Sequence, residues 1–493
     1  MLLLGIDVGT SSVKVSVVET TTQQCLAHAQ YPPTESKIIS LQPGWAEQSP
    51  EMWWQHTCQA VTGLNRSGAF DPQDIGAIGI AYQMHGLVLV DKEQQVLRDS
   101  IIWCDSRAVP YGEKAWQHIG KHECLSSLLN SPGNFTAAKL AWVKDNEPEI
   151  FARIHKMMLP GDYIAMKLTG EITTTVPALS EGIFWDFQKD QVSDEVMDFF
   201  GFSKRIIPDI KPVFSEHGRL SAANGQALGL KAGIPVSYKS GDQPNNALSL
   251  NVFNPGEIAA TAGTSGVIYA VSEELSADAQ SRVNTFAHVN YSPQAKRLGV
   301  LMNINGAGIM NNWVKEYIGS GLNYQQMNEE AAKVATGSNG LRIFPFGNGA
   351  ERIFSNRIIG AQFHRLDLNQ HSGAHIFRAV QEGIAFTFRY GLDIMRSNGI
   401  NPRIIRAGNS NMFQSRLFGE AFVNSTGVPV ELYQNDGSVG AALGAGIGAQ
   451  IFQSPQEAFR KFEPLKIIEP QQTDQYEAVY QDWKALLETQ LNN

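Results

Sequence analysis

The feature that most constrains this chain is a short turn that occurs twice, once in each half of the sequence. Residues 7–12 read DVGTSS, and residues 261–266 read TAGTSG. An apolar run precedes each Gly-Thr-Ser turn and a β-branched run follows it, which predicts two strands joined by that turn. One such hairpin per half predicts two related units, and 493 residues exceed one ordinary core. We therefore expect two domains, residues 1–249 and residues 250–493.

The rest of the chain alternates helix-like and strand-like segments. Residues 50–65, 136–155 and 373–395 carry apolar side chains at the three- and four-residue spacing of an amphipathic helix. Residues 404–427 read as a strand, a glycine turn and a helix that ends at Gly427. Strands and helices in alternation predict an α/β fold in layers.

Composition argues against several classes of protein. The formal net charge of −9 argues against a nucleic-acid surface, because phosphate backbones attract basic patches. The four cysteines form no C-x-x-C pair and have no histidine at zinc spacing, which argues against a zinc site and fits a reducing compartment. No apolar run has the length of a signal sequence or a membrane span. We expect a cytoplasmic protein without a nucleic-acid or membrane partner.

The Gly-Thr-Ser turns suit phosphate groups, because they offer backbone N–H groups and hydroxyls with little side chain in the way. They lack the Gly-Lys-Ser/Thr ending of a P-loop. Asp7 precedes the first turn, and a carboxylate beside phosphates is a usual way to hold Mg²⁺ through water. A single copy would be interpreted as an ordinary turn. The second copy favours a nucleotide held from both sides.

Two further segments place polar side chains at expected strand ends. Asp242 follows a strand pattern and precedes a helix, so it is either a helix cap or a general base for a hydroxyl. Its place just ahead of the second hairpin favours the base. Gln83, Met84 and His85 interrupt an apolar strand pattern beside a glycine. A lone histidine is more often structural, but this setting fits a small polar ligand.

Residues 103–107 read WCDSR. On a strand, Trp103, Asp105 and Arg107 would share one face and offer an aromatic ring beside polar groups, as sugar-binding surfaces do. The alternative is a structural Asp–Arg pair.

The order of these motifs resembles the FGGY carbohydrate kinases of the actin-like ATPase superfamily, and most closely their xylulokinase branch. The Met84-His85 pair is the most specific part of the resemblance, since glycerol kinases carry a different segment there. The matching segments span nearly the whole chain: GIDVGTSSVK, GWAEQSPEMWW, QMHG, WCDSR, NFTAAKLAWV, LPGDY, SGDQPNNA, AGTSG, FPFGNGAER and AVQEG.

The resemblance implies a two-domain, actin-like (ribonuclease H-like) α/β fold with ATP and sugar in a cleft between the domains. It implies Mg²⁺-dependent transfer of the γ-phosphoryl of ATP to the C5 hydroxyl of D-xylulose, and it is compatible with a homodimer. Asp242 would be the general base, and Asp7 and Asp242 would hold Mg²⁺. The implied sugar contacts are Gln83, Met84, His85, Trp103, Asp105 and Gln243. The implied nucleotide contacts are Thr10, Ser11, Gly263, Thr264, Ser265, Gly408 and Asn409.

Three segments depart from the family pattern. RAGNSN at 406–411 replaces a run of glycines in the adenosine loop, Gln243 stands where Asn is usual, and AQFHRL at 361–366 lacks a glycine before its leucine. Two other functions stay open: a kinase of the same family for another ketose or polyol, such as ribulose, and a non-catalytic nucleotide-dependent sensor or chaperone-type ATPase. The Met84-His85 pair favours xylulose, and Asp242 favours a kinase.

Overall fold

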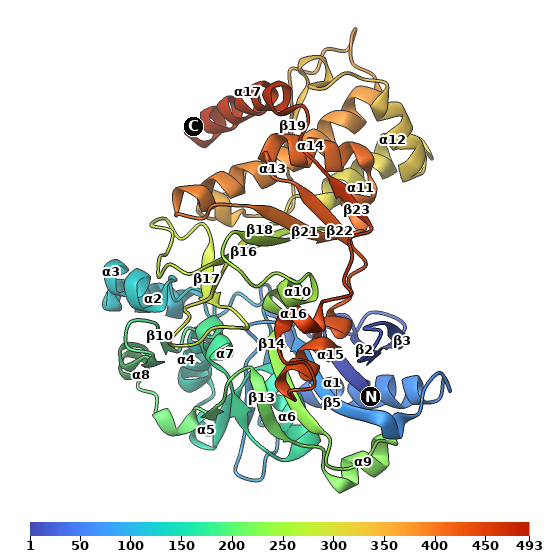
Figure 1. Ribbon diagram of the computed structural model, residues 1–493. Helices are drawn as coiled ribbons and strands as arrows, with labels where there is room; N and C mark the ends of the chain where they lie inside the picture. Colours follow the sequence, from blue (N-terminus) through green and yellow to red (C-terminus); the bar gives the residue numbers. More distant parts are fainter. Residues whose placement is uncertain (493) are drawn as a thin grey trace.

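The computed structural model describes residues 1–492, which form two α/β lobes, one above the other in Figure 1. Each lobe is built on one mixed sheet, so the predicted α/β class is confirmed. The first sheet has the order β13-β14-β5-β1-β2-β3, and the second has the order β17-β18-β16-β15-β21-β22-β23. The strands of the first sheet are β1 (Leu2–Val8), β2 (Val13–Glu19), β3 (Cys25–Tyr31), β5 (Ile75–Tyr82), β13 (Phe214–Arg219) and β14 (Pro235–Gly241). Those of the second are β15 (Glu257–Ala262), β16 (Gly266–Ser272), β17 (Asn284–Ala287), β18 (Leu298–Ile304), β21 (Ile404–Gly408), β22 (Val430–Tyr433) and β23 (Lys466–Ile468).

The two predicted hairpins occupy the same place in the two sheets. Strand β1 pairs antiparallel with β2 and parallel with β5. Strand β15 pairs antiparallel with β16 and parallel with β21. Each hairpin therefore lies in the interior of its sheet, and its turn lies at one end of the two strands that it joins. The repeat seen in the sequence is a repeat of topology.

Helices cover the sheets, and the boundaries of several follow from local sequence. Helix α1 begins after Ser49, whose hydroxyl accepts from the Met52 N–H, and its first residue is Pro50. The single helix predicted over 136–155 is two helices, because Pro148 has no N–H to continue the first. Around the first sheet lie α1 (Pro50–Asn65), α6 (Pro160–Thr169), α9 (Ala222–Leu228), α10 (Asp242–Ser249) and α15 (Gly437–Gly448). The helices of the upper lobe are α11 (Gly308–Tyr317), α12 (Tyr324–Ala332), α13 (Gly373–Ser397), α14 (Arg416–Thr426) and α17 (Thr473–Asn492).

Smaller elements extend the lower lobe beyond its sheet and decorate the upper one. The helices among them are α2 (Val109–Ile119), α3 (Lys121–Glu123), α4 (Thr136–Asn146), α5 (Pro148–Ala152), α7 (Val176–Glu181), α8 (Asp194–Phe200) and α16 (Pro455–Ala458). The short strands are β4 (Glu47–Gln48), β6 (Val88–Val90), β7 (Ser100–Ile101), β8 (Lys156–Met158), β9 (Thr173–Thr174), β10 (Trp185–Asp186), β11 (Gln191–Val192), β12 (Asp209–Ile210), β19 (Arg342–Phe346) and β20 (Gly360–His364). Among the helices of residues 1–492, none combines the length and apolar character that crossing a bilayer requires.

The predicted boundary near residue 250 stays a prediction, but not every described element that follows it lies in the upper lobe. Helix α15 packs on β1, β5 and β14 of the lower lobe, and α16 lies beside it, whereas β23 and α17 return to the upper lobe (Figure 1). The contact needs glycine, because a Cβ on Gly5 would lie 1.7 Å from the Ser438 carbonyl oxygen and one on Gly79 would lie 1.9 Å from that of Ala441. The chain thus crosses between the lobes several times, which ties them together.

Candidate active site

Asp7 lies near the end of β1, and its carboxylate touches the start of α15. A Cβ on Gly437 would lie 2.5 Å from Asp7 Oδ2, so glycine is required there. Burial raises the pKa of Asp7 to about 6; the charge of Asp436 adds to this rise, and Lys14 opposes it. Asp436 is the N-cap of α15 and accepts from the Ser438 N–H at 2.8 Å. Asp7 therefore belongs to a group of carboxylates short of positive charge.

Asp242 is the first residue of α10, directly after β14, where the sequence placed it. Gly241 is the N-cap of α10 and no side chain bonds there, which argues against the helix-cap alternative for Asp242. Burial raises the pKa of Asp242 to about 7; the charge of Asp7 adds to this rise, and hydrogen bonds from Gln243 oppose it. Asp7 and Asp242 thus interact electrostatically, and Gln243 lies next to the Asp242 carboxyl.

Helix α10 joins Asp242 to both hairpins. Asn245 Nδ2 donates to the Gly437 carbonyl at 2.9 Å, beside Asp7. Asn246 Nδ2 donates to Thr261 Oγ1 at 3.4 Å, at the start of the second hairpin, and Asn435 Nδ2 donates to Asn246 Oδ1 at 2.8 Å. The candidate base therefore lies on a helix that contacts the Gly-Thr-Ser hairpin regions of both lobes.

A chain of hydrogen bonds connects the first hairpin with the predicted sugar contacts. Trp103 Nε1 donates to Thr10 Oγ1 at 2.9 Å, and that hydroxyl donates to Gln83 Oε1 at 3.1 Å. Gln83 Nε2 donates to Gln48 Oε1 at 3.0 Å, and Gln48 Nε2 returns to the Thr10 carbonyl at 2.8 Å. The Trp103 side chain is also 52% exposed, so its ring is open to a ligand. Three residues predicted from separate motifs thus meet in one network.

His85 occupies a left-handed turn after β5, with φ of 63°. Its Nδ1 bonds the Glu181 carbonyl at 3.0 Å, and Lys139 Nζ donates to the His85 carbonyl at 2.9 Å. Its ring packs on Phe135 and Phe286, with centroids 4.8 and 5.5 Å apart. Burial, helped by the charge of Lys139, lowers the pKa of His85 to about 3, so the imidazole is neutral. Phe286 belongs to β17, so both halves of the sequence form this wall.

The prediction for residues 103–107 is wrong in one respect. Strand β7 ends at Ile101 and the chain then turns, so these side chains do not share a face. Asp105 is fully buried, accepts from the Ala46 N–H at 2.6 Å and pairs with Arg107 at 2.7 Å. The structural Asp–Arg alternative describes this pair, and Trp103 alone faces outward.

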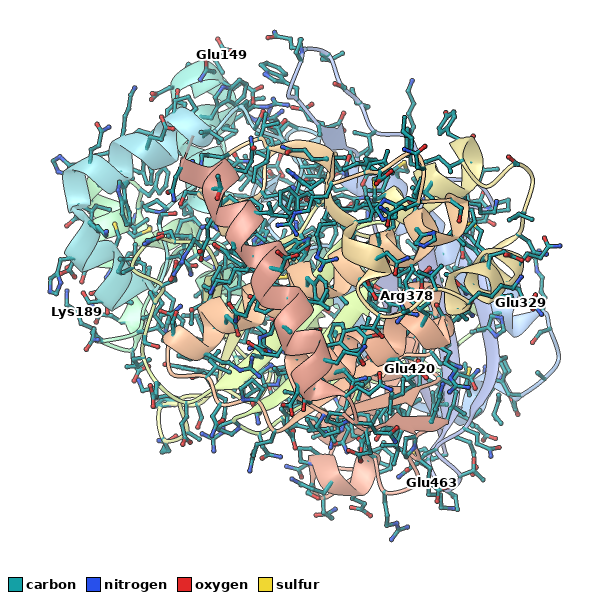
Figure 2. The ribbon with its side chains drawn as sticks, turned by 90° about the horizontal axis from the view of Figure 1, so that it is seen from above. Glu149, Lys189, Glu329, Arg378, Glu420 and Glu463 are labelled. Carbon is teal, nitrogen blue, oxygen red and sulfur yellow. The ribbon has the colours of Figure 1, made fainter. Side chains whose placement is uncertain are left out.

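The second hairpin borders a cavity of about 1260 Å³ in the upper lobe. Of the predicted nucleotide contacts, Gly263 and Thr264 line it, whereas Ser265, Gly408 and Asn409 do not; Ser410 and Asn411, one step further along the adenosine loop, do. Thr10 and Ser11 lie in the lower lobe on the first hairpin. The other walls come from α11 to α14; the wall residues Glu329, Arg378 and Glu420 are labelled in Figure 2. The cavity is large enough for a nucleoside, because ligand pockets span about 300–1,000 Å³.

Asp7 and Asp242 fit a magnesium ion bound largely by water and phosphate better than a metal ion bound by protein side chains alone. Within residues 1–492, no three or more His, Cys, Asp or Glu side chains are grouped to hold a metal. Mg²⁺ keeps several waters and binds through one or two carboxylates plus substrate phosphates. Asp7 and Asp242, each destabilised as an anion by burial and by its neighbours, offer that donor set.

Sequence reasoning missed several neighbours of these residues. They are Lys139, Phe135, Glu181, Phe286 and Asp436. Asp436 had a usable signal, since it follows a strand at a short distance and stands at the start of a helix, as Asp242 does. The others carried none, because only the packing of distant segments brings them to His85 and Asp7.

Comparison with known proteins decides the family. The profile of the FGGY family of carbohydrate kinases, N-terminal domain, matches residues 2–249, and that of the C-terminal domain matches residues 258–449. The chain belongs to the FGGY family of carbohydrate kinases. It is an ATP-dependent sugar kinase, and the predicted two-domain actin-like fold is confirmed.

Individual relatives narrow the comparison. The xylulose kinase of Escherichia coli K12 is 30% identical over 469 residues, which cover 95% of this chain and 93% of that protein. A solved xyloylose kinase from Brucella ovis superposes with a TM-score of 0.89 at 26% identity, covering 99% of both chains. A gluconate kinase from Lactobacillus acidophilus reaches the same TM-score at 20% identity, covering 99% and 98% of the two chains. The fold of this FGGY kinase therefore does not by itself select a sugar.

Proposed function

We propose that this FGGY kinase phosphorylates D-xylulose at its C5 hydroxyl, giving D-xylulose 5-phosphate in pentose catabolism. The observation that carries the proposal is the position of Asp242: it lies between the phosphate hairpins of both lobes, beside Asp7, at the end of a strand next to the Met84-His85 segment. The relatives named xylulose kinase support the choice of sugar.

In this proposal Asp242 accepts the proton of the C5 hydroxyl as that oxygen attacks the γ-phosphorus. A pKa of about 7 suits a general base, which works best when its pKa lies near the operating pH. Phosphoryl transfer depends mainly on positioning and charge neutralisation. When bound, Mg²⁺ supplies part of that neutralisation, held by Asp7 and Asp242.

The two hairpins divide the phosphates between the lobes. Thr10 and Ser11 contact the phosphates from the lower lobe, and Gly263, Thr264 and Ser265 contact them from the upper lobe. The adenosine part lies in the 1260 Å³ cavity, near Gly408 and Asn409. The hairpin turns expose their N–H groups, which suits an anion.

The sugar lies on the lower lobe, against Met84, His85 and the exposed ring of Trp103. A neutral His85 both donates and accepts hydrogen bonds, but its Nδ1 is already engaged, so its Nε2 is left for a hydroxyl. Gln83 and Gln243 complete the polar side.

A sugar panel tests the proposal. ADP release is measured with D-xylulose, D-ribulose, L-ribulose, gluconate and glycerol, and kcat/KM should be highest for D-xylulose. Asp242→Asn should lower kcat by about 10²–10⁴-fold while D-xylulose still binds, because it keeps the shape and removes the base. Asp198→Asn, at an exposed position of α8, is the control and should keep full activity.

Other outcomes identify the alternatives. A clear preference for another ketose or polyol rejects D-xylulose and keeps the kinase. ADP release that ignores every sugar, together with full activity of the Asp242→Asn protein, rejects the assignment of the base and favours a sensor. The molar mass of the protein in solution tests the homodimer, which is part of the same proposal.

A further inference from the structure

Glu181, the last residue of α7, carries a buried carboxyl that no cation pairs with. The residue is 2% exposed, and neither carboxyl oxygen makes a hydrogen bond of ordinary geometry. The buried Tyr82 hydroxyl is a neighbouring donor that partly offsets the rise in the pKa of this carboxyl. Buried polar groups nearly always have a hydrogen-bond partner, because a group that loses its bound water without gaining a partner destabilises the fold. An orphaned carboxyl of this kind indicates a group that pairs with something outside the ligand-free chain.

The surroundings of Glu181 are the proposed sugar contacts. Its carbonyl holds His85 Nδ1 at 3.0 Å. Its Oε2 lies 2.9 Å from the place where a Cβ on Gly241 would be, and Met84 Cγ lies 2.7 Å from the same place. Gly241 directly precedes Asp242. The carboxyl therefore reaches the point where the base and the sugar segment meet.

The nearby cation does not satisfy Glu181. Lys139 Nζ donates to the carbonyls of His85 and Ile102, at 2.9 and 3.0 Å. Burial, with the charge of Asp242 adding to it, raises the pKa of Glu181 well above its ordinary value, and Tyr82 and Lys139 oppose this rise. A carboxyl has two acceptor oxygens, and it gains an O–H donor when it is protonated. A hydroxyl, which also donates and accepts, is its natural counterpart.

We propose that Glu181 is a specificity-determining residue, whose carboxyl hydrogen bonds a hydroxyl of the sugar close to the one that is phosphorylated. This inference rests on the proposed sugar subsite, and with D-xylulose the candidates are the C3 and C4 hydroxyls. The carboxyl remains unpaired in the free protein and gains its partner when the sugar binds. It thereby contributes to sugar recognition at the expense of the stability of the empty enzyme.

The discriminating variant is Glu181→Met, which keeps the length and removes the polar group. The KM for D-xylulose should rise by about 10-fold or more, because a polar contact inside the site is lost. The KM for ATP should stay the same. The melting temperature of the ligand-free protein should rise, because the unpaired carboxyl is gone. The preference for D-xylulose over its C3 epimer D-ribulose or its C4 epimer L-ribulose should shrink.

Asp186→Asn is the matched control. Asp186 is also fully buried, and its Oδ2 makes no hydrogen bond, although Lys189 Nζ lies 3.6 Å away. Its other oxygen accepts from the N–H groups of Gln188 and Lys189 in the turn after β10. That variant should leave the KM for D-xylulose unchanged. An unchanged KM in Glu181→Met, with a lower melting temperature, would show that Glu181 is structural and would overturn the proposal.

A second measurement serves if Glu181→Met does not fold. The KM values of the 3-deoxy and 4-deoxy analogues of D-xylulose are compared in the wild type and in Glu181→Gln. The ratio of analogue to parent should differ between the two proteins for one of the analogues, since coupled groups are not additive. Equal ratios for both analogues overturn the proposal. If the wild type prefers another sugar, the proposed function fails alone, and the same comparison is made with that sugar and its deoxy analogues.

Discussion

The two Gly-Thr-Ser hairpins have matching sequences and strand pairings but different surroundings. In the first, the residue ahead of the turn is Asp7, and Thr10 is fixed by Trp103 and Gln83. In the second, the corresponding residues Thr261 and Thr264 are both exposed.

The second hairpin is held from behind instead. The Gly263 and Thr264 carbonyls accept from the N–H groups of Gly308 and Ile309, at 3.0 and 3.1 Å, where α11 begins. The same local turn can therefore serve two proposed roles, sugar-side positioning in the first hairpin and nucleotide binding in the second. The tertiary partners join the first hairpin to the proposed sugar contacts, and they leave the second open to the cavity proposed for the nucleotide.

The largest expected difference between the hairpins is in kcat, and it concerns the residues that precede the two turns. Asp7→Asn should lower kcat by roughly 10²–10³-fold, since it removes a preorganised charge beside the phosphates. Thr261→Val should cost less than about 10-fold, because its hydroxyl makes only one long bond. Steady-state kinetics with saturating ATP and D-xylulose measure both. Similar losses in the two variants would mean that the hairpins are functionally alike.

A smaller, more selective effect is expected at the threonines inside the turns. Thr10→Val keeps the backbone that the proposal places against the phosphates but breaks the side-chain network to Gln83 and Trp103, so the KM for the sugar should rise about 5- to 10-fold. Thr264→Val should instead raise the KM for ATP by a similar factor, because Thr264 lines the cavity proposed for the nucleotide. Full kinetic matrices for both substrates check the split. A rise in the same KM for both variants would contradict the division of roles.

The charge cluster around Asp7 makes a stability prediction. The pKa of Asp7 is about 6 in the folded protein, above its ordinary value near 4. Between pH 4 and 6 the folded state therefore binds more protons than the unfolded state, so this residue makes stability fall as pH rises through that window. At pH 8 the whole penalty is present, and Asp7→Asn should stabilise the ligand-free, Mg²⁺-free protein by about 3 kcal/mol.

Denaturant unfolding at pH 8 and pH 4.5 measures this effect. The gain from Asp7→Asn should shrink at pH 4.5, whereas any effect of Thr261→Val should be the same at both values. A gain that is independent of pH would mean that Asp7 carries no charge penalty.

The smallest effect concerns how far the hairpins move. The lobes are already joined on the sugar side, where Asn130 Nδ2 donates to the Thr285 carbonyl at 2.5 Å and the Thr285 N–H returns to Asn130 Oδ1 at 3.0 Å. We expect a modest closure about this contact when sugar and nucleotide bind together. D-xylulose and a non-hydrolysable ATP analogue should then tighten each other by the same factor.

Calorimetry of each ligand with and without the other measures the coupling, and small-angle scattering measures the radius of gyration. The radius should fall only with both ligands present. If sugar and nucleotide bind independently and the scattering curves superimpose, the cleft is preformed and the lobes do not close on the ligands.

Much of this protein follows from local sequence. The strand pairs around both hairpins, helix α1 and the strand–helix junction at Asp242 could be predicted because their signals are short-range: β-branched runs, a Ser-Pro start and a carboxylate after a strand. The family also follows from the order of the motifs, and the predicted FGGY membership is confirmed.

Only the tertiary structure decided which side chains meet. Nothing local indicates that α15 leaves the second half to pack on Gly5 and Gly79, or that Phe286 crosses to His85. Asp105 and Glu181 both show this limit of the sequence, one as a wrong prediction and the other as a missed residue. The first was predicted as a sugar contact but is buried against Arg107, and the second was not predicted but lies buried near Asp242 without a cation partner. The reason is physical: burial and pairing depend on segments far apart in the chain, and no spacing of residues along the sequence records those contacts.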